Sequence, residues 1–286
     1  MSGLLNIDKG SPSWWLSNDI WVTPAGDPTT SPGLTDPTEG KPYNVSVRVH
    51  DKYSEPVSSG WNLFLCWAIP TAGPIPVPPA ASGQILNNAA ISVSVPAMSA
   101  VQLPPIPWTP VFRNGGHECL VAMAYNEQAV GFPVTSLNGD APDTDTYSIA
   151  QKNLGVVEVV SPMKRFQYAF QVSNGVDEER SVVIEARQAP LSEIAAFLPG
   201  LKRGRSVIDK PGKVEHVGII ESHQPAAAEL ERAKPLLSRV KMAPRGCRPF
   251  TLGGSLQEGN ALIHVTQSLN DRVVGGLSVL VMATEK

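Results

Sequence analysis

The fold is decided by a stretch that alternates between apolar and polar side chains without a break, YNVSVRVH at residues 43–50. Successive side chains of a strand point to opposite faces, so Val45, Val47 and Val49 would share one face. A period of two is typical of a half-buried antiparallel strand. The stretch therefore predicts a sheet that packs one face against a core.

The sequence on either side repeats this kind of pattern. In WNLFLCWAI at 61–69 both faces are apolar, which predicts a central strand. The other strand candidates are short and separated by many of the 27 prolines and 24 glycines; they lie at 90–95, 117–125, 154–160, 166–172, 181–187, 214–222, 261–268 and 274–283. Many short strands joined by turn residues favour an all-β sandwich over a βαβ fold.

Two domains are expected from this pattern. The Asp/Pro/Thr-rich stretch NGDAPDTDT at 138–146 is the linker candidate, and it divides the chain into two immunoglobulin-like β-sandwiches, 1–145 and 146–286. The first carries a tryptophan-containing N-terminal extension. The second carries a small helical insertion, with helix candidates at 190–200 and 225–238.

Charge is distributed unevenly between the two parts. Residues 1–150 hold five basic and twelve acidic side chains, a net charge of −7, whereas the remainder holds eighteen basic and fourteen acidic ones, a net charge of +4. Surfaces of opposite sign attract between molecules. This favours head-to-tail association of copies, which would be a homo-oligomer. The alternative is that the charges only keep each half in solution.

Four tryptophans are the candidate interaction residues, Trp14, Trp15, Trp21 and Trp108. The first three lie in a polar segment, and burying an indole removes a large apolar area from water. We expect them to tie residues 1–22 to a folded surface, in the same chain or in a neighbouring copy. Exposed rings at Trp14, Trp15 or Trp108 would instead suit a ligand that stacks on them.

Two further groups of residues could carry chemistry. Cys66 and Cys119 lie inside apolar strand patterns, which predicts buried free thiols that could face each other across the sandwich. Asp140, Asp143 and Asp145 form either a solvated linker or a calcium site, because calcium takes oxygen ligands from flexible loops.

No catalytic motif is found in the sequence. There is no G-x-S-x-G, and the residue four positions after His117 is Val121, so His117 and Glu118 do not begin a zinc-binding HExxH. The basic run at 202–205 is short and lacks interleaved aromatics, so nucleic acid is not an expected partner. We expect no cofactor, no metal and no enzymatic activity.

One family resemblance stands out. DIWV at 19–22, GKPYNVSVRVH at 40–50, Trp108 and HECL at 117–120 resemble CARDB-type bacterial immunoglobulin-like domains over about residues 17–126. FQYAFQVSN at 166–174 is similar to a weaker second copy after residue 153. The resemblance implies an accessory or structural module and names no ligand.

The function expected from the sequence is that of a non-enzymatic structural or scaffolding protein whose sandwich surfaces bind protein partners. The alternative is a carbohydrate- or ligand-binding accessory module. No apolar run approaches the length of a membrane span. Residues 1–21 lack a Sec-type signal peptide, so we expect the protein in the cytoplasm or exported by a route without such a signal.

Overall fold

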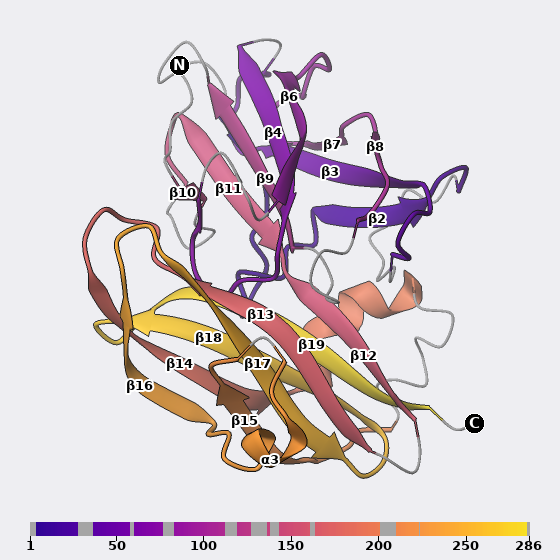
Figure 1. Ribbon diagram of the computed structural model, residues 1–286. Coiled ribbons are helices and arrows are strands. Elements are labelled where there is room, and N and C mark those ends of the chain that lie inside the picture. Colours follow the sequence, from indigo (N-terminus) through magenta and orange to yellow (C-terminus); the bar gives the residue numbers. More distant parts are fainter. Residues whose placement is uncertain are drawn as a thin grey trace.

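The computed structural model shows a chain built almost entirely from strands (Figure 1). The structure describes residues 4–27, 37–57, 60–76, 83–111, 119–126, 136–137, 143–160, 164–200, 210–222 and 224–284. The all-β sandwich class predicted from the alternating patterns is confirmed. Within these residues no helix is long and apolar enough to cross a membrane.

The first half of the chain forms two facing sheets. In one, β3 pairs with all four of its neighbours; the strands are β1 (Leu5–Asn6), β2 (Ile20–Pro24), β3 (Tyr43–Asp51), β7 (Ala100–Gln102) and β8 (Ile106–Trp108). The other has the order β11-β9-β4-β6, with β4 (Trp61–Ala68), β6 (Gly83–Ala90), β9 (Cys119–Asn126) and β11 (Tyr147–Lys152). The core between them buries Val45, Val47 and Val49 as the alternation predicts.

The outer face of the β11-β9-β4-β6 sheet is also apolar and buried. Phe64, Met123 and Ile149 form a second cluster there with Ile75 of β5. The short strand β5 (Ile75–Pro76) pairs with β10 (Ser136–Leu137). The two apolar faces read from residues 61–69 therefore belong to a strand covered on both sides.

The second half forms another sandwich. One sheet has the order β12-β19-β18-β14-β16, from β12 (Leu154–Val160), β14 (Arg180–Ala189), β16 (Leu236–Met242), β18 (Asn260–Leu269) and β19 (Arg272–Thr284). The other has the order β13-β17-β15, from β13 (Arg165–Ser173), β15 (Val214–Ile220) and β17 (Cys247–Leu256). Phe170 and Phe250 stack between them with ring centroids 5.9 Å apart.

Short helices interrupt this half, as the sequence predicts. A 3-10 helix, η1, covers Leu191–Gly200, and a single α-helical turn, α3, covers Ala227–Leu230. The rest of the helix candidate at 225–238 is wrong, because Leu236–Met242 form the edge strand β16. Pro235 ends any helix, and its carbonyl accepts a hydrogen bond from Ala186 of β14.

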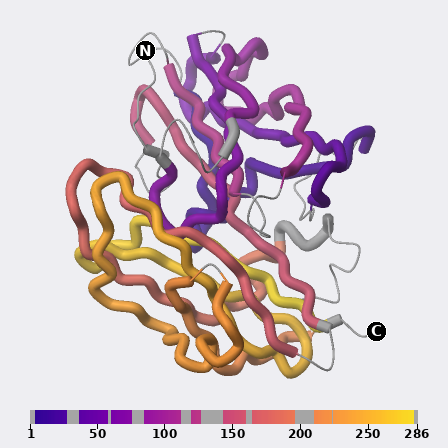
Figure 2. Tube along the Cα trace, viewed as in Figure 1, coloured from indigo at the N-terminus to yellow at the C-terminus, as the bar shows by residue number. Residues whose placement is uncertain are grey.

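The chain passes from one sandwich to the other at Asn153, between β11 and β12. In Figure 2 the indigo-to-magenta half and the orange-to-yellow half occupy separate regions that meet along this junction. Asn153 donates to the carbonyls of Thr71 and Gly276 at 2.8 and 2.9 Å. The backbone there is so close that a Cβ on Gly275 would lie 1.7 Å from the Ala72 oxygen. The placement of a domain boundary at 145/146 stays a prediction; β11, which follows it, pairs with β9 of the first half.

The strand candidate at 90–95 is wrong. Among these residues only Ala90 belongs to a strand, as the last residue of β6, and Val95 makes a single bridge to Val57. Residues 83–90, which lack alternation, form the strand because β4 offers them an antiparallel partner on both sides of an irregularity at Leu86.

Candidate functional site

A serine–histidine–glutamate cluster lies where the N-terminal segment, residues 4–22, meets the second sandwich. Ser13 follows β1, Glu193 belongs to η1 and His264 to β18. The Ser13 hydroxyl donates to Glu193 Oε2 at 2.7 Å and lies 3.2 Å from His264 Nε2. His264 Nε2 is 2.9 Å from the same glutamate oxygen. These residue types serve as nucleophile, base and orienting acid in hydrolases.

This cluster does not form a catalytic relay. In a relay the nucleophile and the acid occupy different imidazole nitrogens, whereas here Ser13 and Glu193 share Nε2. Nδ1 is taken by Ser278 at 2.8 Å, and Ser278 and His264 are both fully buried. The neighbouring pocket of about 370 Å³ is lined by Ser13 and Glu193 but by neither His264 nor Ser278. The cluster acts instead as a clamp on the N-terminal segment.

The protonation states suit a clamp. Burial lowers the pKa of His264, although the hydrogen bond to Glu193 opposes this shift. Burial alone would raise the pKa of Glu193, but the hydrogen bonds from Ser13 and His264 outweigh it and the pKa is lowered. Near neutral pH the clamp therefore joins a neutral imidazole to a carboxylate.

The predicted tryptophans lie mostly inside the molecule. Trp15 packs with Leu16 against the outer face of β18 and β19, and Trp14 meets Trp15 edge-on at 5.5 Å. Trp21 is fully buried in β2, so residues 13–22 are tied to folded surfaces of the same chain. Trp15 and Trp108 are only 4% and 5% exposed, so the alternative, in which exposed rings stack on a ligand, does not hold at these two positions. Their indoles fill intramolecular cores.

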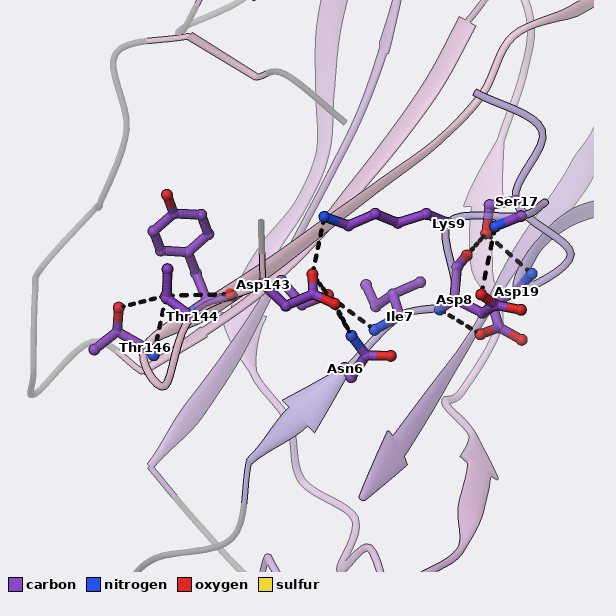
Figure 3. A network of polar contacts seen from close by, with 12 residues as sticks. Asn6, Ile7, Asp8, Lys9, Ser17, Asp19, Asp143, Thr144 and Thr146 are labelled. Carbon is purple, nitrogen blue, oxygen red and sulfur yellow. Dashed lines mark hydrogen bonds and ion pairs between the residues drawn. The ribbon is translucent and has the colours of Figure 1, made fainter. Parts of the chain in front are cut away.

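Of the three aspartates of the linker candidate, the structure describes Asp143 and Asp145, and both are exposed. Asp143 binds Asn6 and accepts from Ser148 at 2.8 Å, and Lys9 Nζ lies 3.1 Å from it (Figure 3). Asp143 is therefore a solvent-exposed residue that also tethers the N-terminal segment. Asp140 lies outside the described residues. In the part of the chain that the structure describes, no group of three His, Cys, Asp or Glu side chains could hold a metal ion.

A second carboxylate, which is buried, supports the same segment. Asp19 Oδ2 accepts from the Asp8 backbone at 2.7 Å and lies 2.6 Å from His50 Nε2. Arg48 is 3.8 Å from the other oxygen and lies over the Trp21 ring at 5.2 Å. Figure 3 shows Asp19 and Asp143 on either side of residues 6–9, which they hold through the backbone and side chains.

Cys66 and Cys119 are free and completely buried, as expected. The idea that they face each other across the sandwich is wrong, because β4 and β9 are neighbours in one sheet and both thiols lie on its outer face. Burial raises the pKa of both thiols. They are packing groups without nucleophilic character.

An open sheet edge is the feature that sequence reasoning missed. β6 ends its sheet and pairs only with β4 among the described strands. Edge strands are usually protected by charges, prolines or extreme shortness. Of the described edge strands with five or more residues, β6 alone has neither a charged residue nor a proline in its sequence, GQILNNAA. The others are β2, β11, β12, β13, β15 and β16.

A groove of about 410 Å³ runs beside this edge, between β6 and residues 103–107. We call it the seam, because it opens between the two sheets of the first sandwich. Its floor includes Leu63 and the nearly buried Leu103, and no charged residue lines it. Three of the five residues 103–107 are prolines, which have no N–H to offer. Only the β6 wall therefore presents an unprotected backbone.

The remaining sequence candidates are not described by the structure. His117, Glu118 and the basic run at 202–205 lie outside the described residues. An uncharged strand followed by a proline-rich return at 103–107 could have signalled the seam. Without the pairing partners of residues 83–90, however, nothing in the sequence showed that they form an edge.

Comparisons with known proteins do not place the chain in a family. No protein family and no curated protein matches it. It is similar to the CupB6 tip adhesin from Pseudomonas aeruginosa, with 10% identity, 99% of this chain and 100% of that chain covered and a TM-score of 0.23. It is also similar to CBD12 from CALX1.2, with 8% identity, 83% of this chain and 92% of that chain covered and a TM-score of 0.20. A third similar structure is Escherichia coli alpha-2-macroglobulin activated by porcine elastase, with 10% identity, 93% of this chain and 22% of that chain covered and a TM-score of 0.23. Similarity this weak bears on neither function nor family, and the resemblance to CARDB-type domains stays a prediction.

Proposed function

We propose that the chain is a non-enzymatic structural protein that binds other protein chains through surfaces of its β-sandwiches. The observation that carries the proposal is the unprotected β6 edge beside the apolar seam. Natural sheets protect long exposed edges unless another chain uses them. The inaccessible imidazole of the Ser13–Glu193–His264 cluster supports the non-enzymatic part.

Copies of the chain are among the partners we propose. The net charge of −7 on residues 1–150 and +4 on the remainder favours contact between the first half of one copy and the second half of another. Such a contact is heterologous, so it would build rings or filaments.

Light scattering on the full chain tests this function over a range of concentrations and salt. The expected result is a particle mass that exceeds 30.5 kDa and rises with concentration at low salt. The mass should fall as salt shortens the screening length to about 3 Å at 1 M. A strict monomer at low salt and high concentration would refute the self-association. Oligomers whose mass does not change with salt would show that apolar contacts, and not charge, hold the copies together.

A further inference from the structure

We infer that the seam binds one extended strand of a partner protein, which adds to β6 and places apolar side chains between the sheets. This inference rests on the proposed function and gives its partner a chemical class. The strand has large apolar side chains at alternate positions, no charge in its central part and basic residues at its ends. Each of these properties follows from a feature of the seam.

The backbone of β6 requires an extended partner. Residues Asn87–Ala90 run in regular antiparallel register with Asn62–Leu65 of β4, after an irregularity at Leu86. The groups on the other side of β6 pair with no described strand. A strand that adds there forms main-chain hydrogen bonds whatever its sequence. The proline-rich wall at 103–107 cannot compete for this partner, because three of its residues have no N–H.

The lining of the seam requires alternate apolar side chains. Asn87 and Ala89 of β6 lie on the inner face of the sheet, together with Leu65 and Leu63 of β4, to which they are paired. Ala89 is small and exposed, and beyond it the seam is bordered by Ile91 and Ile106. Every second side chain of an added strand would point into this space. A charged side chain would find no counter-ion there and would lose its hydration.

The ends of the strand are set by charge complementarity. Residues 1–150 carry a net charge of −7, so the half of the chain that contains the seam is acidic as a whole, although no charged residue lines the seam itself. Basic residues at both ends of the partner strand would be attracted to it and would speed the encounter. An acidic strand with the same central part would be repelled.

The outer face of β6 provides the contrast. Ile85 lies opposite Cys66 and is 42% exposed on that face, away from the seam. A substitution at Ile85 leaves the inner face and the backbone of β6 unchanged. Ile85 is therefore the matched control for Ala89, which lines the seam on the same strand.

Fluorescence anisotropy of a dye-labelled, lysine-flanked peptide of alternating leucine and threonine tests the inference on the full chain. We expect saturable binding that weakens at least tenfold when the leucines and threonines are shuffled out of alternation. An equal loss is expected when alternate amides are N-methylated, since these cannot pair with β6. A glutamate-flanked peptide should bind at least tenfold more weakly at low salt, and no saturation at any accessible concentration would overturn the inference.

Two variants locate the site. Ala89→Arg should weaken binding of the lysine-flanked peptide at least tenfold, whereas Ile85→Arg should change it less than threefold. Unchanged binding by Ala89→Arg would place the peptide elsewhere and refute the inference. If Ala89→Arg abolishes self-association but leaves peptide binding unchanged, the seam is occupied by a second copy of this chain, and the inference of a separate partner protein is refuted. If the chain self-associates with charge-dependent mass but binds no peptide, the proposed function stands and the strand addition does not.

Discussion

The indole N–H of Trp15 donates a hydrogen bond of 2.8 Å to the hydroxyl of Ser278, which lies 263 residues further along the chain. Ser278 also contacts His264, so a loop between two strands of the first sandwich is anchored in the second. Leu16 bridges Lys152 in the last strand of the first half, which extends the same contact. The N-terminal segment therefore holds the two sandwiches together.

Removing the Trp15 ring should weaken this junction strongly. Trp15→Ala empties a buried space between the segment and β19, and such truncations cost about 3–5 kcal/mol. Trp15→Phe keeps most of the apolar area and loses the hydrogen bond to Ser278, so it should cost less. The free energy of unfolding from urea titrations measures both, and equal stability of the alanine variant and the natural chain would contradict the anchoring role.

Gly276 should be intolerant of a side chain for the same reason. A Cβ at this position would lie 2.4 Å from the Trp15 ring. Gly276→Ala therefore has to displace the indole, which we expect to destabilise the protein by about 1–3 kcal/mol. Combining Gly276→Ala with Trp15→Ala should cost less than the sum of the two single changes, because the ring that the methyl meets is then gone.

Acid should release the N-terminal clamp. The pKa of His264 is lowered by burial, so below its ordinary value of 6.5 the unfolded chain binds a proton that the folded chain resists. Stability should therefore fall as the pH drops below 6.5, and it should fall further below 4.5 as the lowered pKa of Glu193 is approached. The facing charges are Glu193, which opposes the His264 shift, and Arg187, which supports it.

His264→Gln separates the two effects. Its stability should lose most of the pH dependence between 6.5 and 5 while the part below 4.5 remains. Melting temperatures across this range measure the slope, with His216→Gln as the control at an exposed histidine. An unchanged slope in His264→Gln would show that another group senses the acid.

The strands that the sequence predicts well are those whose side chains alternate or are apolar on both faces, such as residues 43–50 and 61–69. β17 escapes such reasoning because Pro249 and the pair at 253–254 interrupt it. The proline is tolerated because β15 pairs with β17 only from Thr251 onward, so at Pro249 one side of the strand needs no N–H. β6 likewise depends on its partner and not on its own pattern.

The clamp and the seam could not be predicted for a related reason. Ser13, Glu193 and His264 are brought together over separations of 180 and 251 residues by the docking of the N-terminal segment. None of them belongs to a motif with fixed spacing. The tryptophans signalled that the segment is tied down, but only the tertiary structure shows that the tie crosses to the other sandwich.

Thiol reactivity should distinguish the three cysteines. Cys66 and Cys119 are fully buried and burial raises the pKa of both thiols, whereas Cys247 is exposed, although partial burial of its thiol also raises its pKa. A maleimide or disulfide reagent should therefore label one thiol in the native protein and all three in denaturant. Cys247→Ser should remove the native labelling, and rapid native modification of that variant would show that β4 or β9 opens.

Lys152 should make the junction less stable than an apolar residue would. It is the last residue of β11, only 8% exposed, and burial lowers its pKa from 10.5 to about 7. Between these two values the unfolded chain binds a proton that the folded chain has lost, so stability should rise as the pH rises from 7 to 10.5. One pKa unit corresponds to about 1.4 kcal/mol, so Lys152→Met should stabilise the fold at pH 7 by on the order of 2–4 kcal/mol. In Lys152→Met the stability should also rise less between pH 7 and 10.5 than in the natural chain. Lys41→Met, at an exposed position, should change neither the stability at pH 7 nor its rise with pH. Urea titrations at pH 7, 8.5 and 10 measure the free energy of unfolding of each variant. A Lys152→Met variant that is less stable at all three pH values would show that the interactions of the Lys152 ammonium stabilise the fold by more than its desolvation costs.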